Sequence, residues 1–147
     1  MSFEDLPADW PQRPVTDSEI TADLLDLIVG EADRESGALG ILLCGPGGRL
    51  FQPVVVSAPP AEIGMEDHRR AFDVMCEAMG RLDDGRPGML VAVARPGSRH
   101  ISTEDRRWCD AAVESCAAHD VELLGVWLMT QEVIRPLRLR ASQRRSA

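Results

Sequence analysis

Four short apolar runs, separated by helix-like stretches, limit the folds open to this chain of 147 residues. They are ALGILLC (38–44), LFQPVVV (50–56), MLVAVA (89–94) and ELLGVWLM (122–129). Apolar runs of this length are too short for buried helices and are typical of strands buried in a sheet. The intervening GPGGR sequence (45–49) has the residues of a turn, so the first two runs are predicted to form a hairpin.

Pro53 interrupts the second of these runs. Proline has no backbone N–H to donate to a neighbouring strand, so we place this strand at an edge of the sheet or expect a bulge there. The segment VIRPLRL (133–139) is expected to form a short last strand.

Three other stretches have the apolar spacing of helices. The first is expected to begin at Thr16, whose hydroxyl can accept from the amide of Glu19 while the Glu19 carboxylate reaches back to the Thr16 amide. It should end near Gly37. The other two helices are predicted over about 66–82 and 103–119.

Helices that alternate with buried strands predict an α/β fold of the three-layer, α+β type. We expect a single domain with a mixed sheet of about four to five strands flanked by three helices, in the order α-β-β-α-β-α-β. Residues 1–15 are predicted to be an N-terminal arm around Trp10, residues 16–134 the domain, and residues 135–147 a basic C-terminal tail.

Charge is divided unevenly along the chain. The net charge is −8, and the tail carries five arginines and no acid, so the remaining residues carry −13, that is −8 less +5. A body this acidic repels nucleic acid and anionic membrane surfaces. We therefore expect no membrane association, and contact with nucleic acid only through the tail. The candidate contacts for a partner are Trp10, Arg135, Arg138 and Arg140.

Location and redox chemistry follow from what the sequence lacks. The N-terminus has no signal-peptide pattern, and no apolar run is long enough to cross a bilayer, so we expect a cytoplasmic protein. The four cysteines have no CxxC spacing and are interpreted as buried thiols. Cys44, at a strand end, is the candidate nucleophile should a Cys/His pair exist, whereas His68 and His119 are expected at the surface. The chain has no Lys, Asn or Tyr, whose codons are AT-rich, which indicates a GC-rich bacterial genome.

The segment RPGSRHISTEDRRW (95–108) joins the third apolar run to the last helix. Ser102 and Asp105 have the spacing of a helix-capping box, with acids in the first turn where the helix dipole favours them. Together with Arg95, Arg99 and His100 they form a polar corner suited to holding a carboxylate, a peptide or a phosphate.

The residues around this corner resemble a known protein family. VAVARPGSRHISTEDRRWCDAAVESCAAHDVELLGVWLM resembles the second half of the JAB (JAMM) metalloprotease superfamily, and within it the RadC-like branch. There a strand ends in a His-x-His pair, and a small-residue turn and Ser-x-x-Asp at the start of a helix follow. The resemblance implies that Ser102 and Asp105 stand where the family has its serine and its zinc-binding aspartate.

The histidine positions depart from that family. Counting back without a gap places Ala92 and Ala94 where the two histidines should be, and aligning the turn places Val93 and Arg95 there. Neither pair can bind zinc, and Arg95 would repel a cation. We therefore predict no metal, no cofactor and no catalytic residues.

These observations favour a non-catalytic protein-interaction or scaffold module, a pseudoenzyme resembling a metal-less JAB/RadC-like domain, with a protein partner or a homodimer paired through a sheet edge. One alternative is a JAB-type hydrolase with an atypical metal site, built from His100, Asp105 and a carboxylate such as Glu62 or Glu66. A second alternative is a DNA-associated accessory protein that uses the arginine tail.

Overall fold

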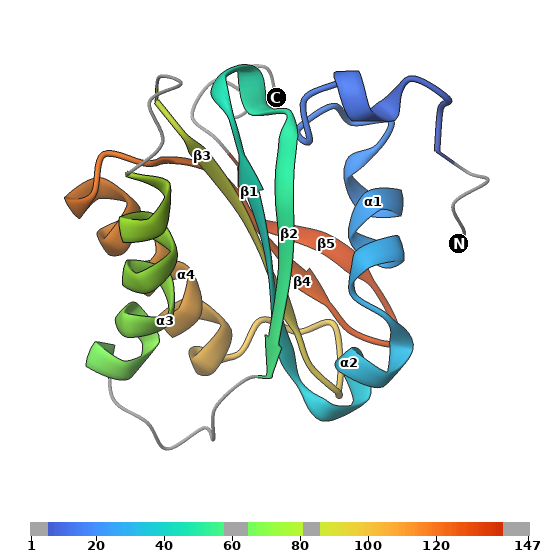
Figure 1. The fold of residues 1–147 in the computed structure, drawn as a ribbon. Helices are drawn as coiled ribbons and strands as arrows, with labels where there is room; N and C mark the ends of the chain where they lie inside the picture. The colour runs from blue at the N-terminus through green and yellow to red at the C-terminus, as the bar shows by residue number, and fades with distance from the viewer. Residues whose placement is uncertain (1–5, 58–64, 81–85, 140–147) are drawn as a thin grey trace.

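A mixed sheet between two helical layers organises the protein (Figure 1). The structure is a computed structural model, and it describes residues 6–57, 65–80 and 86–139. The helical elements are η2 (Trp10–Gln12), α1 (Thr21–Ile28), α2 (Glu31–Ser36), η3 (Pro46–Gly48), α3 (Met65–Met79) and α4 (Thr103–Ala118). The strands are β1 (Ala38–Cys44), β2 (Leu50–Ser57), β3 (Gly88–Ala94), β4 (Glu122–Met129) and β5 (Ile134–Leu139).

The five described strands lie in the order β2-β1-β3-β4-β5. β3 and β4 are parallel, joined by the crossover through α4, and the other neighbours are antiparallel. Every residue of β1 and of β3 is buried, because helices cover both faces of the sheet there. This confirms the predicted α/β class and explains the continuous apolar runs. Within the described residues, no helix is both long and apolar enough to cross a membrane.

Two hydrophobic cores lie on the two faces of the sheet. The first packs α3 and α4 against β1, β3 and β4, with Phe72 and Trp108 in edge-to-face contact at ring centroids 5.9 Å apart. The second packs α1 and the N-terminal segment, including Leu6 and Val15, against the opposite face. Figure 1 shows this division, with α3 and α4 on one side of the sheet and α1 on the other.

Pro53 lies in β2, which is an edge strand, as predicted. The bulge of the hairpin is elsewhere: Leu43 pairs with Gln52 and Cys44 with Leu50, which leaves Phe51 as the extra residue. The sheet extends at its other edge to Leu139, so Arg135 and Arg138 lie in β5. Residues 140–147 of the expected tail, Arg140 among them, lie outside the described residues.

The first helix begins later than predicted, at Thr21 instead of Thr16. The expected capping box is wrong, because Glu19 bonds Arg13 at 2.7 Å and its amide donates to Asp17 Oδ1 at 3.0 Å. The Thr21 hydroxyl donates to the carbonyl of Val15 at 2.6 Å, which fixes the turn before the helix. Local contacts with the N-terminal segment therefore replace the cap.

The sequence also predicts that this helix continues to near Gly37. In the structure it breaks at Val29 and Gly30, and a second short helix follows. Both residues have extended backbone, and the Gly30 amide donates to Asp33 Oδ2 at 3.2 Å to start α2. The break lets Val29 turn into the second core, where it is fully buried.

Val29 packs directly over Gly40 in the middle of β1. A Cβ added at Gly40 would lie 2.6 Å from Val29 Cγ2, closer than side-chain atoms approach in folded proteins. Glycine is needed here for close packing of α1 on the sheet, since its backbone conformation is that of an ordinary strand.

We expect Gly40→Ala to lower the free energy of unfolding by about 1–3 kcal/mol, because the added methyl group overpacks the core. Gly45→Ala is the matched control, since no atom lies within 4 Å of a Cβ at that position. It should change stability by no more than about 0.5 kcal/mol. Urea unfolding curves of both variants provide the measurement, and equal stabilities would contradict this packing argument.

Candidate functional site

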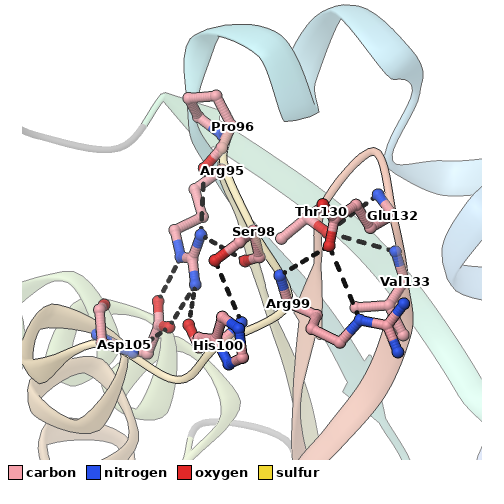
Figure 2. Close-up of polar contacts among 10 residues, drawn as sticks. Arg95, Pro96, Ser98, Arg99, His100, Asp105, Thr130, Glu132 and Val133 are labelled. Carbon is pink, nitrogen blue, oxygen red and sulfur yellow. Dashed lines mark hydrogen bonds and ion pairs between the residues drawn. The ribbon is translucent and has the colours of Figure 1, made fainter.

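Arg95 stands at the point where the chain leaves β3. Its amide still donates to the carbonyl of Met129 at 3.0 Å, so the residue remains aligned with β4. The chain then turns through Gly97, whose φ of +101° is unfavourable for residues with a side chain. The arginine side chain is thereby directed toward the start of α4 (Figure 2).

The guanidinium of Arg95 donates all five of its N–H groups. Nε and Nη2 bind the two carboxylate oxygens of Asp105, each at 2.8 Å. The remaining three go to backbone carbonyls of the connecting loop: Nη1 to Pro96 at 3.0 Å and Ser98 at 3.1 Å, and Nη2 to His100 at 2.8 Å. The loop between β3 and α4 is wrapped around this one side chain, as Figure 2 shows.

Asp105 is fully buried at the third position of α4. Its Oδ2 also accepts from the Ser102 amide at 2.8 Å, and its own amide donates to Ser102 Oγ at 3.0 Å. Ser102 and Asp105 therefore form the capping box that their spacing predicts. Both carboxylate oxygens are occupied by donors of the protein.

Electrostatics at the pair follow from these contacts. Burial alone would raise the pKa of Asp105, but the hydrogen bonds from Arg95 and Ser102 outweigh it and lower that pKa below its usual value. The bonds to Asp105 in turn raise the pKa of Arg95. Asp105 is thus held as a carboxylate beside a permanent cation.

Arg99 and His100 lie at the outer side of the loop. The Arg99 amide donates to Glu132 Oε2 at 3.1 Å, and its Nε lies 3.7 Å from the same oxygen. The amides of Glu132 and Val133 both donate to Thr130 Oγ1 in the β4–β5 turn. His100 contributes its carbonyl to Arg95, while the residue itself is exposed. The predicted corner is therefore divided into a closed part, Arg95 with Ser102 and Asp105, and an exposed part at Arg99.

This geometry does not suit a metal ion. An ion at Asp105 would have to displace the guanidinium and the Ser102 amide from the carboxylate, and Arg95 would repel it. Elsewhere within the described ranges, no three His, Cys, Asp or Glu side chains gather in a way that could hold a metal. Of the acids suggested for an atypical site, Glu66 is exposed on α3 and Glu62 lies outside the described residues.

The candidate partner contacts lie far from the corner in the sequence. Trp10 is half-buried and packs against the second core, so the N-terminal segment covers the sheet instead of extending from it. Arg135 and Arg138 are half-buried in β5. Their charges make this edge of the sheet basic.

Cys44 and His68 differ from their expected roles. Burial raises the pKa of the Cys44 thiol to about 12, which removes it as a nucleophile at neutral pH. His68 was expected at the surface and is completely buried. Its Nε2 lies 2.7 Å from Glu104 Oε2, and its ring packs on Trp108 with centroids 4.2 Å apart. It links the first turns of α3 and α4.

A pocket of about 460 Å³ lies beside the β4–β5 turn. It lies between that turn, α1 and α2, and Asp26, Arg34 and Glu132 line it. Arg34 forms an ion pair with Asp26, and Glu132 is engaged by Arg99. The first pair joins α2 to α1, and the second joins the turn to the β3–α4 loop.

Sequence reasoning missed the residues that tie α3 to α4. His68 with Glu104, and Asp73 with Ser115 and His119, are pairs separated by more than thirty residues. Which side chains of the two helices meet depends on how both helices pack on the sheet that they cover, and the spacing within either helix does not specify this. Comparisons with family models, curated proteins and solved structures give no match. The corner is therefore interpreted from its own geometry.

We expect Arg95→Met to cost about 3–5 kcal/mol of unfolding free energy, because it leaves a buried carboxylate without its cation. Combining it with Asp105→Asn should cost less than the sum of the two single changes, with a coupling of about 1–3 kcal/mol. Arg99→Met with Glu132→Gln is the control cycle in the same loop, where the side chains are 62% and 50% exposed. Its coupling should be about 0–1 kcal/mol. Equal couplings in the two cycles would contradict the role given to Arg95.

The lowered pKa of Asp105 predicts a loss of stability in acid. A carboxyl whose pKa is lower in the folded state stabilises the fold above its unfolded pKa of about 3.9, and that stabilisation is lost as the pH falls toward the folded pKa. The difference in unfolding free energy between wild type and Asp105→Asn should therefore be constant near neutral pH and shrink below about pH 4. Denaturant titrations across this range measure it, and a difference that grows on acidification would be the opposite of our expectation.

Proposed function

We propose that this protein is a non-catalytic protein-interaction module, a metal-less relative of the JAB/RadC-like domains, and that it pairs with a second copy of itself along the outer edge of β2. The observation that carries the first part is the closed ion pair of Arg95 and Asp105. The exposed edge of β2 is the observation that carries the second part, the pairing of two copies.

The direction of the side chains on β3 supports the relationship to a metal-binding ancestor. Ala92 and Ala94 face the second core, on the side of α1, whereas Val93 faces the first core, on the side of α4. Arg95 comes two residues after Val93, so its side chain points to the same side of the sheet, where it binds Asp105. Two alignments with the family were given above. Only the one that puts Val93 and Arg95 at the histidine positions has both side chains on the side of the sheet where Asp105 lies. In this proposal a guanidinium has replaced the metal as the cation beside Asp105.

A guanidinium in that place supports the fold without offering a reactive site. Zinc in a hydrolase keeps an open position for water, whose pKa it lowers. The five donors of Arg95 are all committed to Asp105 and to loop carbonyls, so the group has no donor left for a substrate. This favours an interaction module over the JAB-type hydrolase.

β2 is the edge at which two copies could meet. Phe51 is 63% exposed and Val55 37% exposed, and no charged residue occurs from Leu50 to Ser57. Proteins usually protect an edge strand with charges, prolines or bulges, or cover it, because its unpaired backbone groups can join another strand. β2 has Pro53 and the bulge at Phe51, so the stretch from Val54 to Ser57 is the part of the strand with none of these features. The opposite edge, β5, has such protection in Arg135 and Arg138.

The absence of charge on β2 favours a second copy over a basic partner at this edge. The body of the chain is strongly acidic, so two copies repel one another over most of their surfaces. An uncharged strand is the place where that repulsion is least. A basic partner would find no acid on β2 to recognise.

We expect sedimentation velocity to show a dimer whose fraction rises with concentration, and Val55→Lys to abolish it by placing a charge on the strand edge. Val74→Lys is the matched control, because Val74 is also an exposed valine, 56% accessible, but lies on α3. It should leave the dimer intact.

Two results would overturn different parts of this proposal. A wild-type protein that stays monomeric at the highest soluble concentration, or a dimer unaffected by Val55→Lys, would refute pairing through β2. Zinc retained at one equivalent after purification and dialysis would refute the metal-less assignment.

A further inference from the structure

β2 forms one edge of the sheet (Figure 1). Within this strand, Pro53 pairs with Leu42 of β1, and its carbonyl accepts from the side-chain Nε2 of Gln52 at 3.0 Å. A proline in an edge strand turns its nitrogen away from the neighbouring strand, because it has no N–H to donate. The backbone of Pro53 therefore faces outward, where its nitrogen has no hydrogen and its carbonyl already has a donor.

The backbone direction of Pro53 determines that of the residues after it. In an antiparallel strand, the N–H and C=O of one residue point to one side, and those of the next residue point to the other. The pairing of β2 with β1 is regular from Pro53 to Ser57. Val55 and Ser57 therefore point their amides and carbonyls outward, as Pro53 does. Val54 and Val56 point theirs toward β1.

The outward groups of Val55 and Ser57 are the ones open to another strand. Before Pro53 the strand carries the bulge at Phe51, which bends it and disturbs regular pairing. Val55 is 37% exposed, and neither it nor Ser57 carries a charge. Within the described part of β2, the site for a further strand is thus short and lies at the C-terminal end.

We propose that the strand that joins this site is β2 of the second copy, antiparallel, about a two-fold axis at Val56. The inference rests on the pairing proposed above and names the segment of the second copy that takes part. A two-fold axis repeats every contact, so Val55 of each copy lies opposite Ser57 of the other. Every outward amide and carbonyl of these residues then has a hydrogen-bond partner, and the two Val56 residues face one another on the axis.

An axis at Val55 would satisfy fewer of these groups. It would place Ser57 opposite Pro53 of the second copy, which has no N–H for the Ser57 carbonyl and whose own carbonyl already accepts from Gln52. Backbone groups that lose water without gaining a hydrogen bond weaken an interface. Hydrogen bonding therefore favours the axis at Val56.

The other edge of the sheet is a poorer partner for β2. β5 contains Pro136, and its pairing with β4 is irregular next to that proline. Pairing of β2 in one copy with β5 in the next would join two different edges, so each added copy would leave an edge free and the assembly would not close. Two β2 strands form a closed dimer instead.

The first test compares backbone amide exchange in the wild-type protein by NMR, at concentrations where sedimentation shows mostly monomer and mostly dimer. We expect exchange at Val55 and Ser57 to slow about fivefold or more in the dimer, because their amides gain partners. Exchange at Val54 and Val56 should change little, since β1 already binds their amides. Slowing confined to Val54 and Val56, or slowing at β5 instead of β2, would overturn the proposed pairing.

Single cysteines locate the axis independently. In Val56→Cys the two new thiols face one another across the axis, where Cα atoms about 4.5 Å apart permit a disulfide. In the matched variant Val55→Cys the thiols are diagonal neighbours about 7–8 Å apart, beyond the reach of a disulfide. After treatment with oxidised glutathione, we expect a dithiothreitol-sensitive dimer from Val56→Cys and none from Val55→Cys. The wild type, whose four cysteines are free thiols, is the blank.

These outcomes separate the register of the pairing from the dimer itself. A wild-type dimer whose folded Val56→Cys variant forms no link, or forms one no faster than Val55→Cys, would overturn the axis at Val56 and leave dimerisation standing. A wild-type protein that stays monomeric would refute the dimer, and the proposed pairing with it. Should either cysteine variant fail to fold, amide exchange in the wild type decides the register.

Discussion

The ion pair between Arg95 and Asp105 is the interaction on which the β3–α4 connection depends. A parallel pair of strands requires a crossover, and this crossover must leave the end of β3, turn, and start α4 within eight residues, 95–102. Such a short loop exposes carbonyl groups that no strand or helix satisfies. Arg95 satisfies three of them while neutralising the carboxylate that caps α4. One side chain at the end of the strand thus joins the loop and the helix, and its removal would leave unpaired groups in both.

A guanidinium and a metal ion would stabilise this corner in different ways. A metal needs several ligands placed around a point, and it can keep one position for a reacting molecule. Arginine is covalently attached to β3 and offers planar donors in a fixed fork, which match a carboxylate on one side and carbonyls on the other. Its contribution requires neither histidines nor a cofactor. The proposed replacement therefore retains the capping aspartate and the fold around it while removing the chemistry.

Much of the sheet could be predicted from the sequence because its signals are local. The runs at 38–44, 89–94 and 122–129 are apolar on both faces, and the structure buries both faces there. The Ser102–Asp105 cap was predictable for the same reason, since both partners lie within one turn. The start of α1 was not, because contacts of Glu19 with Arg13 and of Thr21 with Val15 compete with the local cap. Nor could the binding of Arg95 to three carbonyls be predicted, since the sequence does not reveal where a loop carbonyl points.

The two faces of β2 lie in different surroundings, so its outer edge and the core behind it can vary independently. Val54 and Val56 pack into the first core, the one that also contains Cys76 and Cys116. Val55 lies between them in sequence and therefore points to the other face, away from that core. A charge at Val55 therefore changes the edge without entering the core that α3 and α4 cover. Pairing along the outer edge of β2 does not depend on the packing of these two helices against the sheet.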